Sequence, residues 1–295
     1  MRKNQTSITA MGIAALRAVE SEKSEGERIC FDPYARRFLP GWFYQMLRLF
    51  IISGYAEWRG KGVVGFLTAR ERYIDDYLDE CVKAGFDQLV ILGAGYDSRA
   101  YRFKAQNDRL RVYEIDHPAT QQKKLDCVRK IFGSLPGHVR YVPIDFNHQT
   151  LQDCLLAHGY DPHARSIFIW QGVTYYLTPA GVDITLAFIA RHAGPGSSVI
   201  FDYIDRALLT GSTHHGEVKG MHRFRGMTGE DLNFGIPMSQ IEPFLTQRGF
   251  VGVKNIRSED LKAMVFTGKN QSRNVMSGYA IVSARLSEQQ AQGGL

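Results

Sequence analysis

From residue 88 onward, short apolar runs alternate with longer segments whose apolar residues recur at helical spacing. The runs are QLVIL, LRVYEID, HVRYVPID, SIFIWQG and SSVIFDYI, followed by FVGVKNI and MSGYAIVSA. Such runs, bounded by Gly, Pro and polar residues, are typical of buried strands. We expect the later helices over PATQQKKLDCVRKIF, Gln149–His158, TPAGVDITLAFIARHAG and Ser239–Arg248. This alternation predicts an α/β fold with a doubly wound parallel sheet, and the last two runs bring the expected total to seven strands.

The first 85 residues have a helical pattern instead. Apolar residues from Ala10 to Ala18 recur at helical spacing, and LTARERYIDDYLDECVKAG ends at Gly85, a common helix stop. Between them, FDPYARRF and GWFYQMLRLFIISGYAEW are expected to pack on the core as a cap or lid. We therefore predict an N-terminal helical cap (1–85), a sheet domain (86–285) with a polar insertion after strand five (205–237), and a frayed tail (286–295).

Composition and charge narrow the class of protein. The chain has 295 residues, 44% apolar and 22% charged, which excludes a disordered or fibrous chain. Thirty-six Lys and Arg against 30 Asp and Glu is a mild basic excess, compatible with an acidic small molecule or with RNA. The four Cys lie far apart, so we expect free thiols and no zinc site or disulfide. Because no signal peptide or membrane-spanning stretch is visible, we expect a cytoplasmic protein without a membrane partner.

Polar features follow each of the first four strands, at the edge where open α/β sheets bind ligands. They are Gly93 and Gly95, then Glu114 and Asp116, then Asp145 and Phe146, then Gln171 with Tyr176 close behind. The glycines allow a close backbone approach, an acid after strand two can accept ribose hydroxyls, and an Asp beside an aromatic ring suits adenine. Each feature alone could be a tight turn, a helix cap or a loop residue. Their order at successive strand ends favours a nucleotide-containing cofactor.

Several segments make the chain recognisable. They are TA…RAVES, FDPYA, TARERYIDD, LGAGYDSRAYR, VYEIDHP, PIDF, QGVTYYLTP and VIFDY. Through these segments, from about Thr9 to Ala284, the chain resembles the leucine carboxyl methyltransferase family. L-G-A-G-x-D-[ST]-R is specific to this group, because most methyltransferases carry G-x-G-x-G. The resemblance implies a class I, Rossmann-like methyltransferase fold and S-adenosyl-L-methionine as cofactor. It also implies O-methylation, since the family includes bacterial carboxyl methyltransferases of polyketide-type pathways.

The resemblance also implies roles for single residues. Arg70 would hold the methionine carboxylate, Gly93 and Gly95 would line the methionine arm, Asp116 would take the ribose hydroxyls, and Asp145 and Phe146 would contact the adenine. Gln171 stands where many relatives have Glu. Its amide can still bind the amino group of the cofactor, but one negative charge beside the sulfonium is missing. Arg70 has an alternative reading as an ordinary helix ion pair with Glu71, Asp75 or Asp76.

The acceptor pocket is expected from the cap and the insertion. A carboxylate acceptor is already anionic at pH 7, whereas a phenol, with a pKa of about 10, would profit from a histidine base. The catalytic candidates are Tyr176, His214 and His215, of which the two histidines would act as bases. Candidate substrate-binding residues are Arg223 and Arg225 as anion holders, and Tyr176 and Tyr203 as pocket residues. We predict that a carboxylate of a small organic acid or natural-product intermediate becomes a methyl ester. A base-assisted phenol or alcohol methyltransferase is the alternative.

Two other classes of protein remain open. A nicotinamide-dependent oxidoreductase shares the acid after strand two, but the chain lacks the third Gly of G-x-G-x-x-G and any Tyr-x-x-x-Lys pair. An RNA-modifying role finds some support in a basic run after the glycines and in a tRNA-modifying branch of the family. The run comprises Arg99, Arg102, Lys104, Arg109 and Arg111. However, it alternates with core positions, and no aromatic and basic stripe accompanies it.

Overall fold

The computed structural model describes residues 8–103, 109–145, 148–211 and 232–288. Within these ranges a seven-stranded sheet has the order β3-β2-β1-β4-β5-β7-β6. The strands are β1 (Gln88–Leu92), β2 (Arg111–Asp116), β3 (Val139–Pro143), β4 (Ser166–Trp170), β5 (Ser198–Ile204), β6 (Phe250–Arg257) and β7 (Tyr279–Leu286). Strands β1 to β5 pair in parallel, while β7 runs antiparallel to both β5 and β6. The seven predicted runs all form strands, which confirms the predicted fold class; an apolar run does not reveal the direction of β7.

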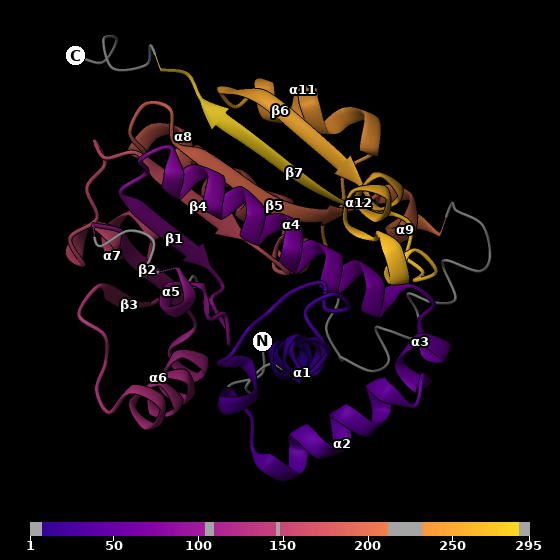
Figure 1. Ribbon diagram of the computed structural model, residues 1–295. Helices are drawn as coiled ribbons and strands as arrows, with labels where there is room; N and C mark the ends of the chain where they lie inside the picture. Colours follow the sequence, from indigo (N-terminus) through magenta and orange to yellow (C-terminus); the bar gives the residue numbers. More distant parts are fainter. Residues whose placement is uncertain (1–7, 104–108, 146–147, 212–231, 289–295) are drawn as a thin grey trace, which may run out of the picture.

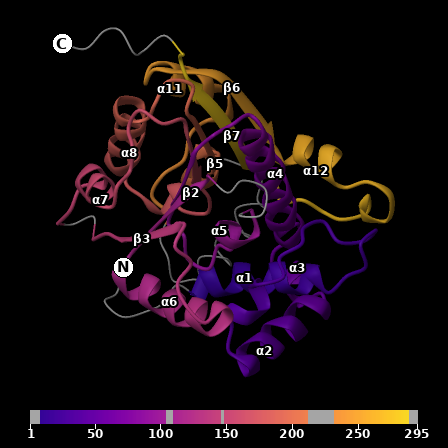
Figure 2. The same ribbon diagram turned by 60° about the vertical axis from the view of Figure 1, so that its left-hand side comes forward.

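The two faces of the sheet bury two separate apolar cores. Side chains alternate along each strand, so Leu89 and Ile91 of β1 face one core while Val90 and Leu92 face the other. The second core is closed by α7 (Leu151–Ala157), α8 (Pro179–His192) and α11 (Ile241–Thr246). Figure 2 shows α7 and α8 on the side of the sheet opposite α4. This doubly wound arrangement leaves the carboxyl ends of the parallel strands together at one edge.

The N-terminal helices share the first core with the sheet. They are α1 (Ile8–Ser21), the 3-10 helix η1 (Ala35–Phe38), α2 (Gly41–Ile52), α3 (Tyr55–Arg59) and α4 (Val63–Lys83). Figure 1 shows α4 lying along the sheet, with α1 and α2 below it. Ala14 of α1, Phe38 of η1 and Ile74 of α4 are buried in one cluster with Leu89 and Ile200 of the sheet. The cap is therefore packed on the same core as β1 and β5.

The remaining described helices are short except for α6, which has 15 residues. They are α5 (Arg99–Arg102), α6 (Pro118–Phe132), η3 (Thr174–Tyr176), α9 (Arg206–Thr210), η4 (Met238–Gln240), α12 (Ser258–Val265) and η5 (Gly268–Asn270). The helix expected at Gln149–His158 is α7, and the one expected at Ser239–Arg248 is divided between η4 and α11. The N-cap oxygen of Thr178 accepts from the Gly181 N–H, as the sequence predicts for the start of α8. Strand β7 ends at Leu286, the first residue of the expected tail.

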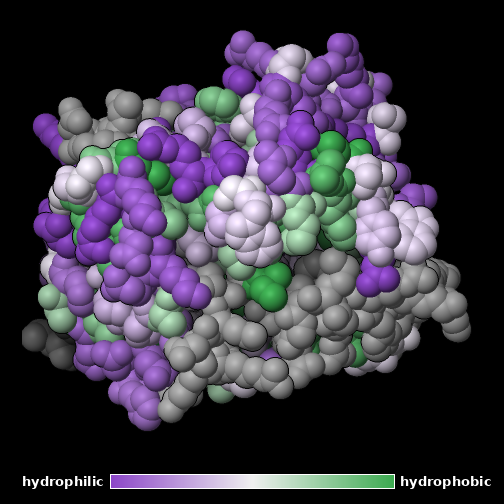
Figure 3. All heavy atoms as spheres, turned by 90° about the horizontal axis from the view of Figure 1, so that it is seen from below, coloured by the Kyte–Doolittle hydropathy of each residue, from purple (hydrophilic) through white to green (hydrophobic). Residues whose placement is uncertain are grey.

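The outer face of α2 is apolar and exposed. Trp42, Met46, Leu49 and Ile52 are all at least half exposed, and they recur at helical spacing. Helix α2 is the lowest element in Figure 1, and Figure 3, seen from below, shows green and pale residues among purple ones on this side. Among the described residues, no helix combines the length and apolarity needed to cross a membrane.

Candidate functional site

The turn after β1 has a conformation that requires glycine. Gly93 and Gly95 have φ angles of 70° and 44°, in the left-handed region that other residues rarely adopt. A Cβ on Gly93 would lie 2.5 Å from Cγ2 of Val173, in the loop after β4, and one on Gly95 would lie 3.3 Å from Cβ of Ala10 on α1. Gly93 is nevertheless exposed. The turn is thus tight, and its exposed backbone lies between the loop after β4 and α1.

The two acids of β2 have different surroundings. The Oδ2 atom of Asp116 accepts from the Gly95 N–H at 2.5 Å, and its Oδ1 atom accepts from the His117 N–H at 2.6 Å. Burial raises the pKa of Asp116, and these two N–H donors partly offset the effect. Glu114 is fully buried, with an Oε2 atom 2.8 Å from Nζ of Lys124 on α6, and burial raises its pKa to about 7. Asp116 therefore adjoins the glycine turn, while Glu114 belongs to a core ion pair.

Arg70 lies on α4 and is buried beneath the strand ends. Its Nη1 donates to Oδ2 of Asp202 on β5 at 2.6 Å, and Oδ1 of Asp202 accepts from the Gly172 N–H at 2.6 Å. Burial opposes the charge of the guanidinium, but the adjacent Asp202 carboxylate outweighs it and raises the pKa of Arg70. Within the described part of the chain, the buried Nε has no hydrogen-bond partner. Arg70 is thus not paired along its own helix, and it keeps one unused donor.

Gln171 and Glu71 join the loop after β4 to α4. Nε2 of Gln171 donates to Oε1 of Glu71 at 2.5 Å, and the Glu71 residue is only 2% exposed. The Oε1 atom of Gln171 is buried and has no hydrogen-bond partner among the described residues. The site therefore offers one unused donor on Arg70 and one unused acceptor on Gln171.

The residues after the glycines fasten the cap to the turn. Arg99 donates from Nε to Asp75 at 2.7 Å, from Nη1 to Asp97 at 2.5 Å and from Nη2 to Glu71 at 2.9 Å. Burial opposes ionisation of Asp97, but the nearby arginines, Arg99 first, lower the pKa of its carboxyl. Arg102 also donates to Asp75, from Nη1 at 2.7 Å. The sequence places Arg99 and Arg102 in a basic run, but Arg99 is buried and Arg102 half-buried in ion pairs, so neither is presented as an RNA-binding surface.

A second set of contacts reaches α1. Arg17 donates from Nε to Oδ2 of Asp32 at 2.9 Å and from Nη2 to the Tyr96 carbonyl at 2.5 Å. Ser98 donates to the same Asp32 oxygen at 2.7 Å. The Asp-Ser-Arg part of the recognised motif consequently connects the turn to α1, to the segment before η1 and to α4.

The other predicted site residues divide into two groups. Asp145 follows β3 and is half-buried, and Tyr176 lies in η3 beside Tyr175 with ring centroids 4.7 Å apart. Tyr203 points into the second core, where its hydroxyl donates to Oδ1 of Asn255 at 2.9 Å, so we do not retain it as a pocket residue. Phe146, His214, His215, Arg223 and Arg225 lie outside the described residues.

Asp202 and Glu71 were not predicted as site residues. Asp202 has a clear signal in the sequence, since it is the only charged residue within the fully buried strand SVIFDYI. A lone carboxylate in such a strand needs a partner. Glu71 has a weaker signal, because an acid in a helix rich in Asp, Glu and Arg usually faces solvent. Only the fold brings it next to Gln171, 100 positions away.

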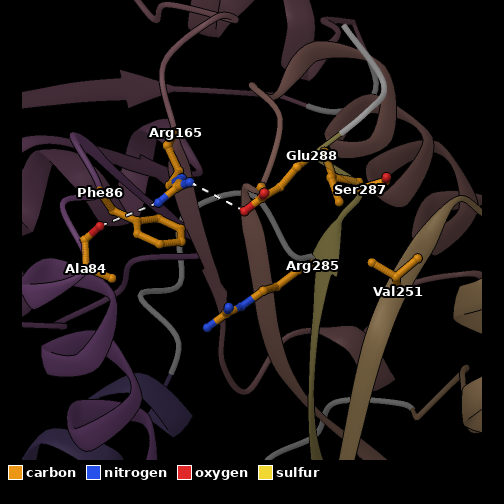
Figure 4. Close-up of a pocket in the computed structure, with 9 residues that line it drawn as sticks. Ala84, Phe86, Arg165, Val251, Arg285, Ser287 and Glu288 are labelled. Atoms are coloured by element: carbon orange, nitrogen blue, oxygen red, sulfur yellow. Dashed lines mark hydrogen bonds and ion pairs between the residues drawn. The ribbon is translucent and has the colours of Figure 1, made fainter.

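A separate cavity of about 280 Å³ lies at the opposite edge of the sheet. Its lining includes Phe86 before β1, Arg165 before β4 and Arg285 near the end of β7. Figure 4 shows Arg165 directed toward Glu288, with which it forms a 3.7 Å ion pair. Because these residues lie at the amino ends of β1 and β4, the cavity is remote from the glycine turn. Among the described residues, no cluster of His, Cys, Asp and Glu could hold a metal ion.

The fold and the strand-end site together define a class I methyltransferase. A solved structure from Thermobifida fusca, provisionally described as a methyltransferase, matches with a TM-score of 0.61 at 14% identity, covering 97% of both chains. Residues 10–190 match the leucine carboxyl methyltransferase family, and the chain belongs to this family.

Curated relatives have the same assignment. YktD of Bacillus subtilis is 31% identical over 204 residues, which cover 69% of this chain and 67% of YktD. A protein of Mycolicibacterium paratuberculosis is 33% identical over 214 residues, covering 68% and 66% of the two chains. Both are provisionally named S-adenosyl-L-methionine-dependent methyltransferases. The predicted enzyme class and cofactor are thereby confirmed: the protein is an S-adenosylmethionine-dependent methyltransferase.

Proposed function

We propose that this enzyme methylates a carboxylate oxygen of a small organic acid and releases a methyl ester. When bound, S-adenosylmethionine supplies an electrophilic methyl group on a sulfonium. The displacement is in line, so the protein mainly has to hold both reactants in the correct geometry, an effect that can amount to roughly 7–11 kcal/mol. The membership of the chain in the leucine carboxyl methyltransferase family supports a carboxyl acceptor.

The residues at the strand ends fit the cofactor. The unused Nε donor of Arg70 suits the methionine carboxylate, and the unused Oε1 acceptor of Gln171 suits the α-ammonium group. Gly93 offers exposed backbone because it has no side chain of its own. Asp116, at the end of β2, would accept the ribose hydroxyls, and Asp145, after β3, would contact the adenine. These assignments give each polar part of the cofactor a partner of complementary chemistry.

The cap positions and shields this site. Helix α1 contacts the glycine turn through Ala10, and the buried Arg17 holds the helix to Asp32 and to the Tyr96 carbonyl. A fixed α1 would keep water away from the sulfonium and restrict the approach of the acceptor. The insertion 205–237, much of which lies outside the described residues, would complete the acceptor pocket.

One observation carries the choice of a carboxylate acceptor: three charged groups at the site are already engaged. Arg70 is paired with Asp202, Glu71 with Arg99, and Asp116 with two backbone N–H groups. His117, next to Asp116, uses Nδ1 to accept from the Ala119 N–H at the start of α6. An acceptor that is ionised before it binds requires none of these groups as a base.

The product identifies the acceptor atom. We would incubate the enzyme with S-adenosylmethionine labelled in its methyl group and a panel of small carboxylic acids and phenols. Mild alkali releases volatile methanol from a methyl ester but not from an aryl methyl ether. Alkali-labile product from the acids supports the proposal, whereas alkali-stable product from the phenols alone contradicts it.

A further inference from the structure

The contact between Glu71 and Gln171 fixes the orientation of an amide. A carboxylate only accepts hydrogen bonds, so the Gln171 group that contacts Oε1 of Glu71 at 2.5 Å must be the Nε2 donor. The Oε1 atom of Gln171 is then turned away from Glu71 as an acceptor, and it is the atom without a partner in the described chain. Glu71 thus decides which end of the amide is left for a ligand.

Glu71 also carries charge that position 171 lacks. Its residue is 2% exposed, its Oε2 accepts from Nη2 of Arg99 at 2.9 Å, and Nη1 of Arg17 lies 3.5 Å from its Oε1. The amide of Gln171 is neutral, so position 171 itself offers no charge to an ammonium group. A carboxylate is nevertheless present one hydrogen bond away, on α4.

We propose that Glu71, acting through Gln171, supplies the negative charge and the amide orientation that hold the α-ammonium group of the cofactor. This inference rests on the proposed placement of the cofactor. A charge beside an amide strengthens the amide carbonyl as an acceptor, and it attracts a nearby cation through a medium of low dielectric constant. Glu71 is a positioning residue, since it reaches the ligand only through Gln171.

If Glu71 acts through Gln171, the carboxylate and the amide can exchange places between positions 71 and 171. In the double variant Glu71→Gln/Gln171→Glu, the new amide at position 71 can accept from Arg99 with its oxygen and donate to the new carboxylate with its nitrogen. The charge and the pairing are both kept, with donor and acceptor reversed. Each single variant loses either the charge or the pairing. Glu71→Gln removes the charge, and Gln171→Glu removes the hydrogen bond because it places two carboxylates in contact.

The test is a double-mutant cycle on the full chain with two ligands. S-adenosylhomocysteine has the α-ammonium group, whereas 5′-methylthioadenosine lacks the amino-acid arm. We expect Glu71→Gln to weaken S-adenosylhomocysteine binding about tenfold and to leave 5′-methylthioadenosine within about twofold, since a hydrogen bond to a charged group is the one weakened. The exchanged double variant should return to within about twofold of wild type for both ligands.

A matched control separates positioning from stability. Asp75→Asn also removes a carboxylate from Arg99, whose Nε lies 2.7 Å from Asp75, but the Asp75 carboxylate contacts Arg99 and Arg102 and not the amide of position 171 among the described residues. It should leave the affinity ratio of the two ligands unchanged. Equal weakening of both ligands in Glu71→Gln, or a double variant as weak as that single variant, overturns the inference. If the wild-type protein binds 5′-methylthioadenosine as tightly as S-adenosylhomocysteine, or binds neither ligand, the proposed placement of the cofactor is wrong. That result is distinct from a failure of the role of Glu71, which only the variants test.

Discussion

Arg70 on α4 and Asp202 on β5 are 132 positions apart in sequence and form a buried hydrogen-bonded ion pair of 2.6 Å. The second oxygen of Asp202 accepts from the Gly172 N–H, so the pair also fixes the loop after β4. One carboxylate therefore orients a guanidinium and a backbone turn at the same strand end. The stability of the fold and the geometry of the site depend on the same contact.

Breaking this pair should cost much of the stability of the fold. Arg70→Met leaves Asp202 as an uncompensated buried charge, and we expect the free energy of unfolding to fall by about 3–5 kcal/mol. Arg72→Met is the matched control on the same helix, because the Arg72–Asp76 pair is more than half exposed and should contribute about 1 kcal/mol or less. Chemical denaturation measures both. Equal small losses in the two variants would mean that Asp202 is solvated.

Asp116 should be decisive for cofactor affinity. We expect Asp116→Ala to weaken S-adenosylhomocysteine binding by about 1–3 kcal/mol, since the ribose hydroxyls lose their acceptor in a desolvated site. Asp145→Ala should weaken it by a similar amount through the adenine. Calorimetry measures both effects, and circular dichroism checks that the chain is still folded, because Asp116 also accepts a hydrogen bond from the Gly95 turn. Wild-type affinity in both variants would place the cofactor elsewhere.

Glu114 should make stability depend on pH. Burial raises its pKa to about 7, above the ordinary value of 4.5. Between these values the folded chain keeps a proton that the unfolded chain has lost, so this contribution is present below pH 4.5 and is lost as the pH rises through 7. Relative to Glu114→Gln, wild type should lose roughly 1.4 kcal/mol for each unit that the pKa is raised. If the free energy of unfolding of wild type and of Glu114→Gln changes in parallel from pH 4.5 to 8, the pKa of Glu114 is not raised in the folded chain.

Removing α1 should abolish methyl transfer and also weaken the fold. Deleting residues 1–20 removes Arg17 from Asp32 and Glu20 from Arg273, both buried or half-buried ion pairs of 2.9 Å. The melting temperature should fall, by roughly 2–4 °C for each kcal/mol lost at this chain length. Arg17→Met keeps the helix and controls for stability. If the truncated enzyme is folded and transfers methyl at the wild-type rate, α1 is not part of the site.

The pH dependence of turnover separates the two acceptor classes. With saturating cofactor, a carboxylate acceptor should give a rate that is nearly flat from about pH 6 to 9, because the nucleophile is already ionised. A phenol acceptor gives a rate that climbs through this window. A steep rise that disappears in His214→Ala or His215→Ala would identify a base-assisted enzyme instead.

The architecture could be predicted because its signals are local. The run QLVIL is β1 residue for residue, and Pro118 and Thr178 start α6 and α8 as their chemistry requires. Glycines at 93 and 95 are likewise required by their positive φ angles. Each of these features depends on a few neighbouring residues, so a single sequence contains the necessary information.

The buried charges could not be paired from the sequence. The segment around Arg70 also contains Glu71, Asp75 and Asp76, so the sequence leaves an ion pair within the helix open as an alternative. The actual partner, Asp202, is on a strand that follows more than 100 residues later. The same holds for Glu71 and Gln171. Contacts of this kind depend on how α4 packs on the sheet, and the spacing of apolar residues along the chain does not predict that packing.

The most direct test of the account is a calorimetric titration of the full chain with S-adenosylhomocysteine, in parallel with NAD and NADP. We expect one saturable site for S-adenosylhomocysteine, weaker binding in Asp116→Ala and no heat of binding from either nicotinamide cofactor. Binding of NAD or NADP without any response to S-adenosylhomocysteine would contradict the strand-end site as we have assigned it.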